Sequence, residues 1–213
     1  PFGVPVQVYQ NPVITSLTAD TVCQGTPTEF KRDAVPGDTS ALVYSWDYGD
    51  LQNSINQNPI HQHPYLTCNT YSVTLNVVDG NTCSDDENTY AVVRCNPVAD
   101  FWFENKCLGD SVEFTNQTTL APGTNASSWL WNFGDNPPAG SSLYEPTYLY
   151  DSSGTYTVTL TVIDDQLTSG LYGCISTQPY NIEIYALPEP SFETNIACEG
   201  DMTTFTNTSI IVN

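Results

Sequence analysis

The chain has 213 residues, 39% of them hydrophobic, and it carries 4 Lys and Arg against 24 Asp and Glu, a formal net charge of −20. Nucleic acids and anionic membranes are bound through Lys and Arg, so this charge argues against both as partners. No apolar run approaches the ~18 residues of a membrane-spanning helix, and we do not expect the chain to span a membrane.

The first expected element is a strand close to the amino terminus. Residues 4–12 resemble residues 90–97, which end the unit that follows. We therefore assign residues 1–13 to the last strand of a preceding repeat. Because a lone strand is not stable by itself, we expect the parent chain to extend in both directions.

Three Cys-x-Gly phrases then divide the chain, and a Phe follows each cysteine by seven residues. These are Cys23-Gln24-Gly25 with Phe30, Cys107-Leu108-Gly109 with Phe114, and Cys198-Glu199-Gly200 with Phe205. Such fixed spacing indicates a repeated folding unit. We predict a first repeat at 14–97, a second at 98–187, and the N-terminal strands of a truncated third repeat at 188–213.

Two longer phrases recur inside the first two repeats with an offset of 85 residues. Ser45-Trp46-Asp47-Tyr48-Gly49-Asp50 returns as Leu130-Trp131-Asn132-Phe133-Gly134-Asp135, and residues 71–79 return as 156–164. Apolar residues alternate with Ser, Thr and Asn in 71–77, which indicates a strand with one buried face. Several short strands in a unit of this size predict an all-β, two-sheet sandwich.

The first of these phrases also predicts local roles. Trp46 and Trp131 supply large core anchors, each worth several kcal/mol when buried. Gly49 and Gly134 permit a tight turn with positive φ, and Asp50 and Asp135 can accept backbone N–H groups there.

Together the two phrases resemble the PKD (polycystic kidney disease) domain, and the resemblance covers nearly the whole chain. It implies tandem immunoglobulin-like, seven-stranded β-sandwiches in a linear array. The Cys-x-Gly openings and Pro-bounded linkers look like those of large secreted surface proteins of Bacteroidota, which implies a gliding-associated adhesin exported by type IX secretion. The phrase departs from the family pattern at Leu51 and Asn136, which follow the Asp where Gly is usual, and at Asn132 in place of Asp.

Seven cysteines in an acidic, β-rich chain favour an oxidising, extracellular location and structural disulfides. The repeats suggest the pairs Cys23–Cys83 and Cys107–Cys174. A hairpin register in which Tyr71 faces Val92 brings Cys68 opposite Cys95, and Cys198 then needs a partner outside the chain. Metal binding is the competing interpretation, but there is no Cys-x-x-Cys and the only histidines are His61 and His63.

Acidic loop residues raise the alternative of bound calcium, which takes six to eight oxygen ligands. The candidate ligands are Asp47, Asp50, Asp79, Asp135, Asp164 and Asp165. No EF-hand spacing accompanies them, so a solvated acidic surface is the favoured interpretation and no cofactor is expected.

Motifs for catalysis are missing from the sequence: there is no Gly-x-Ser-x-Gly, no His-Glu-x-x-His and no phosphate loop, and we do not expect an enzyme. Short motifs do match glycosylation sites. The candidates are Thr21 and Ser111, in Asp-Ser/Thr-apolar triplets of the kind that resemble Bacteroidota O-glycosylation, and the Asn-x-Ser/Thr asparagines Asn116, Asn125 and Asn207.

These observations predict a non-catalytic, extracellular spacer of a cell-surface adhesin that displays a binding tip. Its expected partners are neighbouring repeats of the same chain and, through a distal domain, a surface polysaccharide or protein. Two alternatives stay open. One is an accessory module of a secreted hydrolase such as a chitinase or protease, and the other is a filament subunit with strand complementation between chains.

Overall fold

A computed structural model describes residues 3, 6–38, 40–57, 60–61, 65–166 and 173–211, and the chain folds into two compact units. The first unit contains Pro1–Asn96 together with Ala121–Asn125 and Asp164–Cys174. The second contains Pro97–Leu120, Ala126–Ile163 and Ile175–Asn213. Every regular element in the described residues is a strand, and nothing there forms a helix long and apolar enough to cross a membrane.

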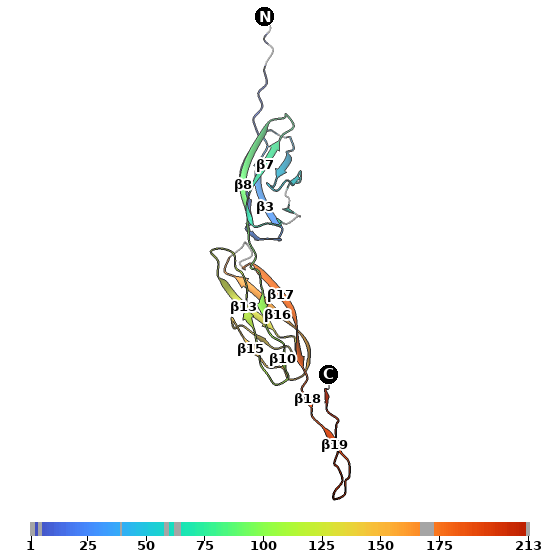
Figure 1. Ribbon diagram of the computed structural model, residues 1–213. Helices are drawn as coiled ribbons and strands as arrows, with labels where there is room; N and C mark the ends of the chain where they lie inside the picture. Colours follow the sequence, from blue (N-terminus) through green and yellow to red (C-terminus); the bar gives the residue numbers. More distant parts are fainter. Residues whose placement is uncertain are drawn as a thin grey trace. The chain divides into compact units, whose positions relative to one another are not determined.

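The first unit is built from two β-sheet layers (Figure 1). Its strands are β1 (Val13–Ala19), β2 (Val22–Cys23), β3 (Thr28–Val35), β4 (Val43–Asp47), β5 (Asn53–Ser54), β6 (Ile60–His61), β7 (Asn69–Val78) and β8 (Ser84–Arg94). The described residues form one sheet in the order β1-β3-β6 and a second in the order β2-β8-β7-β4-β5. All pairings are antiparallel except that of β2 with β8, which is parallel.

Period-two alternation explains how the first unit closes. Val73, Leu75 and Val77 of β7 are fully buried, while the residues between them face outward. Opposite them Phe30 packs against Trp46, with ring centroids 5.6 Å apart. Burying these large apolar side chains is the main force that holds the two sheets together.

The second unit repeats this arrangement. Its strands are β9 (Phe101–Trp102), β10 (Lys106–Cys107), β11 (Val112–Glu113), β12 (Thr115–Asn116), β13 (Ala126–Asn132), β14 (Gly140–Ser141), β15 (Thr147–Tyr148), β16 (Gly154–Asp164) and β17 (Ile175–Tyr185), followed by β18 (Pro188–Glu189), β19 (Phe192–Thr194), β20 (Phe205–Asn207) and β21 (Ile210–Ile211). The sheet order β10-β17-β16-β13-β14 reproduces β2-β8-β7-β4-β5. Short pairs β9·β12 and β11·β15 stand where the first unit has β1-β3-β6. The predicted tandem immunoglobulin-like sandwiches are confirmed.

Residues 188–211 form only two short strand pairs, β18·β21 and β19·β20. The rings of Phe192 and Phe205 touch, with centroids 5.6 Å apart, but their exposed fractions are 65% and 69%. At the same position as Phe205, Phe30 and Phe114 are each only 2% exposed. At the other end, residues 6–12 lie outside any strand, and the predicted strand at 1–13 stays a prediction.

The register of the β7–β8 hairpin differs by one residue from the predicted one, since Tyr71 pairs with Ala91 rather than Val92. The turn explains the difference. The Asp79 N–H donates to the Cys83 carbonyl at 3.0 Å, and Thr82 adopts a positive φ of 69°. A turn residue in the left-handed region is typical of a hairpin loop with a bulge, and the loop type sets the register.

Candidate functional site

The Trp-x-x-Gly-Asp phrase of the first repeat lies at the end of β4, and its side chains are hydrogen-bonded within the fold. Trp46 is 1% exposed, and its indole N–H donates to the Asn56 carbonyl at 2.9 Å. Gly49 has φ 74°, and a Cβ there would lie 2.4 Å from the Ser72 carbonyl oxygen. The Asp47 carboxylate accepts the Gly49 N–H at 2.9 Å, which closes the turn. The phrase therefore closes the turn after β4 and packs this turn closely against the backbone of β7.

The second copy repeats these bonds. The Trp131 indole N–H donates to the Leu143 carbonyl at 2.9 Å, and the Asn132 side-chain oxygen accepts the Gly134 N–H at 2.9 Å. Gly134 has φ 78°, and a Cβ there would lie 2.3 Å from the Thr157 carbonyl oxygen. Asn132 thus makes the same turn bond as Asp47, because either side chain offers an oxygen acceptor.

Asp135 has a further partner in the second repeat. Its carboxylate accepts the Ala139 N–H at 2.8 Å and a hydrogen bond from the Tyr148 hydroxyl. Burial opposes ionisation of Asp135, but the bonds from Tyr148 and Ala139 outweigh it and lower the pKa of the carboxyl. The bond to Asp135, with burial, raises the pKa of Tyr148 to about 12.

Two of the candidate calcium ligands, Asp79 and Asp164, are buried in the hairpin turns instead of opening toward solvent. Asp79 accepts the N–H groups of Asn81 and Cys83 at 2.9 and 3.0 Å. Asp164 accepts those of Gln166 and Cys174 at 3.0 and 2.8 Å. Each carboxylate therefore holds a hairpin turn by accepting backbone N–H groups.

The other candidate ligands are also bonded within the chain. Asp165 accepts the backbone and side-chain N–H groups of Asn125, both at 3.0 Å, and Asp50 accepts the Gln52 N–H at 3.1 Å. The bonds from Asn125 lower the pKa of Asp165. Within the described ranges no group of three or more His, Cys, Asp or Glu side chains is placed to hold a metal ion. His63 lies outside the described residues, and the calcium hypothesis stays untested.

Two disulfides are present in the first unit, Cys68–Cys95 and Cys23–Cys174. Cys68–Cys95 is the pair named from the sequence. Cys23–Cys174 joins residues 151 apart in the chain, with Cα atoms 5.5 Å apart, and it replaces both predicted pairs, Cys23–Cys83 and Cys107–Cys174. Those two predictions were wrong.

Strand length explains this correction. Cys23 pairs with Arg94 at the end of β8, whereas Cys83 precedes Ser84 at its start. A strand of 11 residues separates them by roughly 35 Å, far beyond the ~7 Å that a disulfide can bridge between Cα atoms. The same holds in the second repeat. Cys107 pairs with Tyr185 at the end of β17, whereas Cys174 precedes Ile175 at its start.

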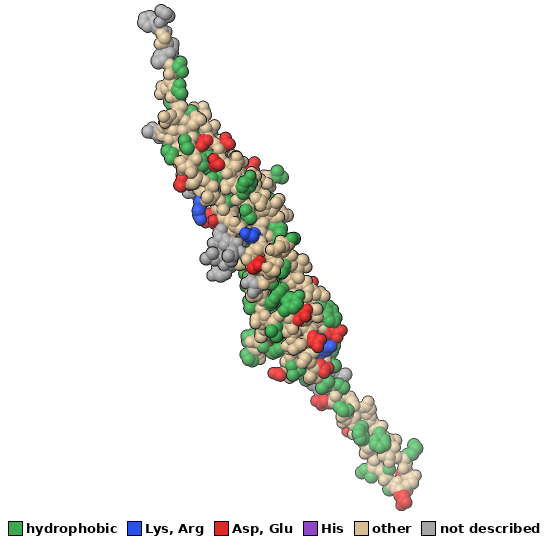
Figure 2. Space-filling view, turned by 90° about the vertical axis from the view of Figure 1, so that its left-hand side faces the viewer, with side chains coloured by type: hydrophobic (Ala, Val, Ile, Leu, Met, Phe, Trp, Pro, Cys, Tyr) green, Lys and Arg blue, Asp and Glu red, His purple; other side chains and the backbone are tan. Residues whose placement is uncertain are grey.

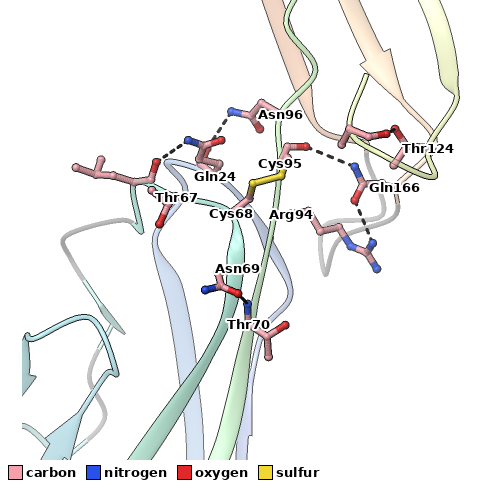
Figure 3. Close-up of a disulfide and its surroundings, with 12 residues drawn as sticks. Gln24, Thr67, Cys68, Asn69, Thr70, Arg94, Cys95, Asn96, Thr124 and Gln166 are labelled. Carbon is pink, nitrogen blue, oxygen red and sulfur yellow. Dashed lines mark hydrogen bonds between the residues drawn. A yellow bond between two sulfur atoms is a disulfide. The ribbon is translucent and has the colours of Figure 1, made fainter. Parts of the chain in front are cut away.

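Polar side chains surround Cys68–Cys95 (Figure 3). The Gln166 amide donates to the Cys95 carbonyl at 3.4 Å and accepts a bond from the Arg94 guanidinium at 3.2 Å. On the other side, the Asn96 amide donates to the Gln24 carbonyl at 3.0 Å. These bonds hold the chain around the end of β8 to Gln24 and Gln166.

The predicted glycosylation residues differ in accessibility. Asn116 is 7% exposed, and its amide nitrogen donates to the Tyr144 carbonyl at 3.2 Å, so the folded domain does not present it for modification. Ser111, Asn125 and Asn207 are exposed, and Thr21 is partly buried.

Figure 2 shows acidic side chains scattered over the visible face rather than gathered in one patch.

Sequence reasoning missed a pair of tyrosines that fasten the Trp phrase in each repeat. The Tyr65 hydroxyl donates to the Tyr48 carbonyl at 3.0 Å, and the Tyr150 hydroxyl donates to the Phe133 carbonyl at 2.9 Å. Burial raises the pKa of both Tyr65 and Tyr150. Their spacing was the available signal, because Tyr65 and Tyr150 are 85 residues apart like the rest of the repeat.

Two immunoglobulin-like sandwiches, each with a buried Trp and a Gly-Asp turn, define this chain as a tandem β-sandwich module. The family model described as "PKD domain" matches residues 9–93 and again 94–172. The chain therefore belongs to the PKD domain family and carries two PKD domains in tandem.

The chain is similar to regions of a metalloprotease and of a collagenase. "Pre-pro-metalloprotease PrtV" of Vibrio cholerae serotype O1 is 40% identical over 88 residues, which are 38% of this chain and 9% of that protein. "Microbial collagenase" of Vibrio alginolyticus is 32% identical over 80 residues, with coverage of 38% and 9%. The crystal structure of the PKD1 domain from the Vibrio cholerae metalloprotease PrtV is 34% identical with a TM-score of 0.35, over 42% of this chain and 96% of that domain.

The match spans about 9% of the length of these curated relatives. Their names give no support to the Bacteroidota adhesin, gliding or type IX secretion that the sequence resemblance implied.

Proposed function

We propose that this chain is a non-catalytic accessory region of an extracellular hydrolase. The observation that carries the proposal is the 40% identity over 88 residues to a region of a metalloprotease. The hydrogen bonds favour a structural role for the Trp phrases and the turn aspartates, because their side chains are bonded within the fold. The two disulfides support an oxidising, extracellular location.

The accessory role predicts that the sandwiches act on the presentation of a bulky substrate rather than on the chemistry. Purified full-length parent protein is compared with a version that lacks residues 14–187. Each is assayed on fibrillar collagen or casein and on a short soluble peptide. Deletion should lower hydrolysis of the bulky substrate at least several-fold and leave the peptide rate unchanged.

Two outcomes would contradict the proposal. If the full-length protein hydrolyses neither kind of substrate, the hydrolase assignment is wrong. If the isolated 213-residue chain itself hydrolyses the peptide, the non-catalytic assignment is wrong.

A second candidate function is the spacer of a cell-surface protein. Cys23–Cys174 favours it, because a disulfide between residues 151 apart joins the first repeat to the hairpin turn of the second. The third Cys-x-Gly phrase, at Cys198, also indicates that the repeats continue. Surface labelling of intact cells, with no hydrolysis by the full-length protein, would select this function over the accessory one.

A further inference from the structure

Among the described residues, Cys83, Cys107 and Cys198 are unpaired, although the chain holds two other disulfides. Cys83 is partly buried, and Cys107 is exposed. Cys23 holds the same position in the first repeat that Cys107 holds in the second, and Cys174 corresponds to Cys83. The bond between Cys23 and Cys174 therefore shows that a cysteine at either kind of position can form a disulfide.

One of the two positions lies where the chain enters its repeat. The Ile14 N–H, at the start of the first repeat, donates to the carboxylate of Asp85 at 2.8 Å, and Asp85 follows Cys83 by two residues. The Ala99 N–H, at the start of the second, donates to the hydroxyl of Ser176 at 3.2 Å, two residues after Cys174. Cys83 and Cys174 are thus the entry cysteines.

The other position lies where the chain leaves. The Gln24 N–H donates to the carbonyl of Arg94, at the end of the last strand, at 2.8 Å. The Leu108 N–H donates to the carbonyl of Tyr185 at the same distance, 2.8 Å. Cys23 and Cys107 are thus the exit cysteines.

An entry and an exit cysteine of one repeat cannot pair, because an 11-residue strand holds them roughly 35 Å apart. The exit cysteine of a repeat instead lies at the end from which the chain continues to the next repeat. Cys23–Cys174 is such a bond, from the exit of the first repeat to the entry of the second.

We propose that Cys23–Cys174 is one of a series of disulfides in which each exit cysteine pairs with the entry cysteine of the following repeat. Cys107 then pairs with the entry cysteine of the repeat that Cys198 opens, and Cys83 pairs with the exit cysteine of a preceding repeat. Exit and entry cysteines are 60 residues apart in the first repeat and 67 in the second. The partner of Cys107 thus lies about 60 to 67 residues after Cys198, by the same spacing.

Each bond is an oxidation that needs an acceptor. The two thiols lose two protons and two electrons as the Sγ–Sγ bond forms. A small-molecule disulfide such as oxidised glutathione takes both and is released as two thiols, through a mixed-disulfide intermediate. The inference does not rest on the proposed function, since either a hydrolase or a surface protein could carry such a series.

The test extends the chain by one repeat in its own register. Residues 1–187 are followed by a second copy of residues 97–213, so that Leu187 again precedes a proline. The half-exposed Ile175 of the second copy is changed by I175V, which marks its Cys174 peptide by mass. The protein is folded in a glutathione buffer, its free thiols are alkylated, and its peptides are mapped without reduction.

We expect Cys107 of the first copy to be linked to the marked Cys174 peptide, and Cys23 to the unmarked one. The extension adds two cysteines, and the number of alkylated thiols should stay at three, as in the 213-residue chain. The C107S substitution in the first copy is the control, and it should leave the marked Cys174 as a free thiol.

Three results would overturn the proposal. They are an alkylated marked Cys174 in a protein with native tryptophan fluorescence, a bond from Cys107 to the unmarked Cys174, and a dimer linked through the marked Cys174. Should the extended chain not fold, peptide mapping of the natural parent protein decides instead. There Cys83 must be bonded to a cysteine that begins a Cys-x-Gly phrase, and any other partner refutes the series.

Discussion

In the first PKD domain a disulfide joins Cys68, just before β7, to Cys95, just after β8, and the second domain has Ser153 and Ala186 at these positions. The second domain has an additional aromatic ring in its core at one position. Phe101 lies 5.0 Å from Trp131 and 5.0 Å from Tyr180 between ring centroids, where the first domain has Leu17 in place of Phe101.

The Gly-Asp turns differ in a similar way. In the second domain Asp135 is bonded to Tyr148, whereas the position of Tyr148 is His63 in the first. The buried Trp, the positive-φ Gly and the fastening Tyr are common to both domains. Interior positions are therefore fixed by the fold, while the bonds that reinforce each domain at its edges differ between the two domains.

The largest expected effect tests what the domains share. Replacing Trp46 or Trp131 with Ala should destabilise its own domain by about 4 kcal/mol, because each ring is almost fully buried and leaves a cavity. Urea unfolding followed by circular dichroism measures the loss. The control is W102A, since Trp102 is 50% exposed and should cost less than about 1 kcal/mol. Equal losses for Trp102 and Trp131 would contradict the assignment of the core.

The next effect tests what the domains do not share. The double substitution C68S/C95S opens a loop with a sequence separation of 27 and should lower the stability of the first domain by about 3.5 kcal/mol. The second domain is the internal control and should unfold at the same urea concentration as before. The reciprocal change S153C/A186C should raise the midpoint of the second domain under oxidising conditions only. A shift in both domains after C68S/C95S would show that they do not unfold independently.

A similar but smaller loss is expected from the turn glycines. G49A and G134A each place a Cβ within 2.4 Å of a backbone carbonyl oxygen at positive φ, so each should cost about 3 kcal/mol. G123A is the matched control, because Gly123 has φ 80° but no atom within 4 Å of the added Cβ. It should cost about 1 kcal/mol from backbone strain alone. If G123A and G134A cost the same, strain rather than the close approach of β16 sets the requirement for glycine.

The fold could be predicted from the sequence because its information is local and repeated. Alternation in 71–77 identifies the buried face of β7, and the 85-residue offset shows that the same face exists twice. The Cys23 pairing could not be read from the same offset. Equivalent positions indicate that two cysteines have the same place in their repeats. Whether two cysteines can form a disulfide depends on which end of a strand each lies at.

Strand length was the missing quantity. β8 and β17 each have 11 residues, and counting them would have excluded both incorrect pairs. The one-residue error in the hairpin register has a similar origin, since nothing in the sequence indicates that Thr82 has a positive φ. Local patterns therefore predict the faces of the strands, whereas the ends and turns depend on geometry that only the structure supplies.

The smallest expected effect concerns Tyr148, which only the second domain has. Its pKa rises to about 12 when folded, against about 10 in an unfolded chain, so the folded state keeps its proton more tightly. The stabilisation is complete below pH 10 and is lost as the pH rises from about 10 to about 12. Y148F should therefore be less stable than the natural chain by about 1 kcal/mol at pH 8, and this gap should close by about pH 12. Urea midpoints at the two pH values measure it, with Y144F as the control, because Tyr144 lies in the same domain and is exposed. A gap that stays constant across this range would show that the bond between Tyr148 and Asp135 does not distinguish the second domain from the first.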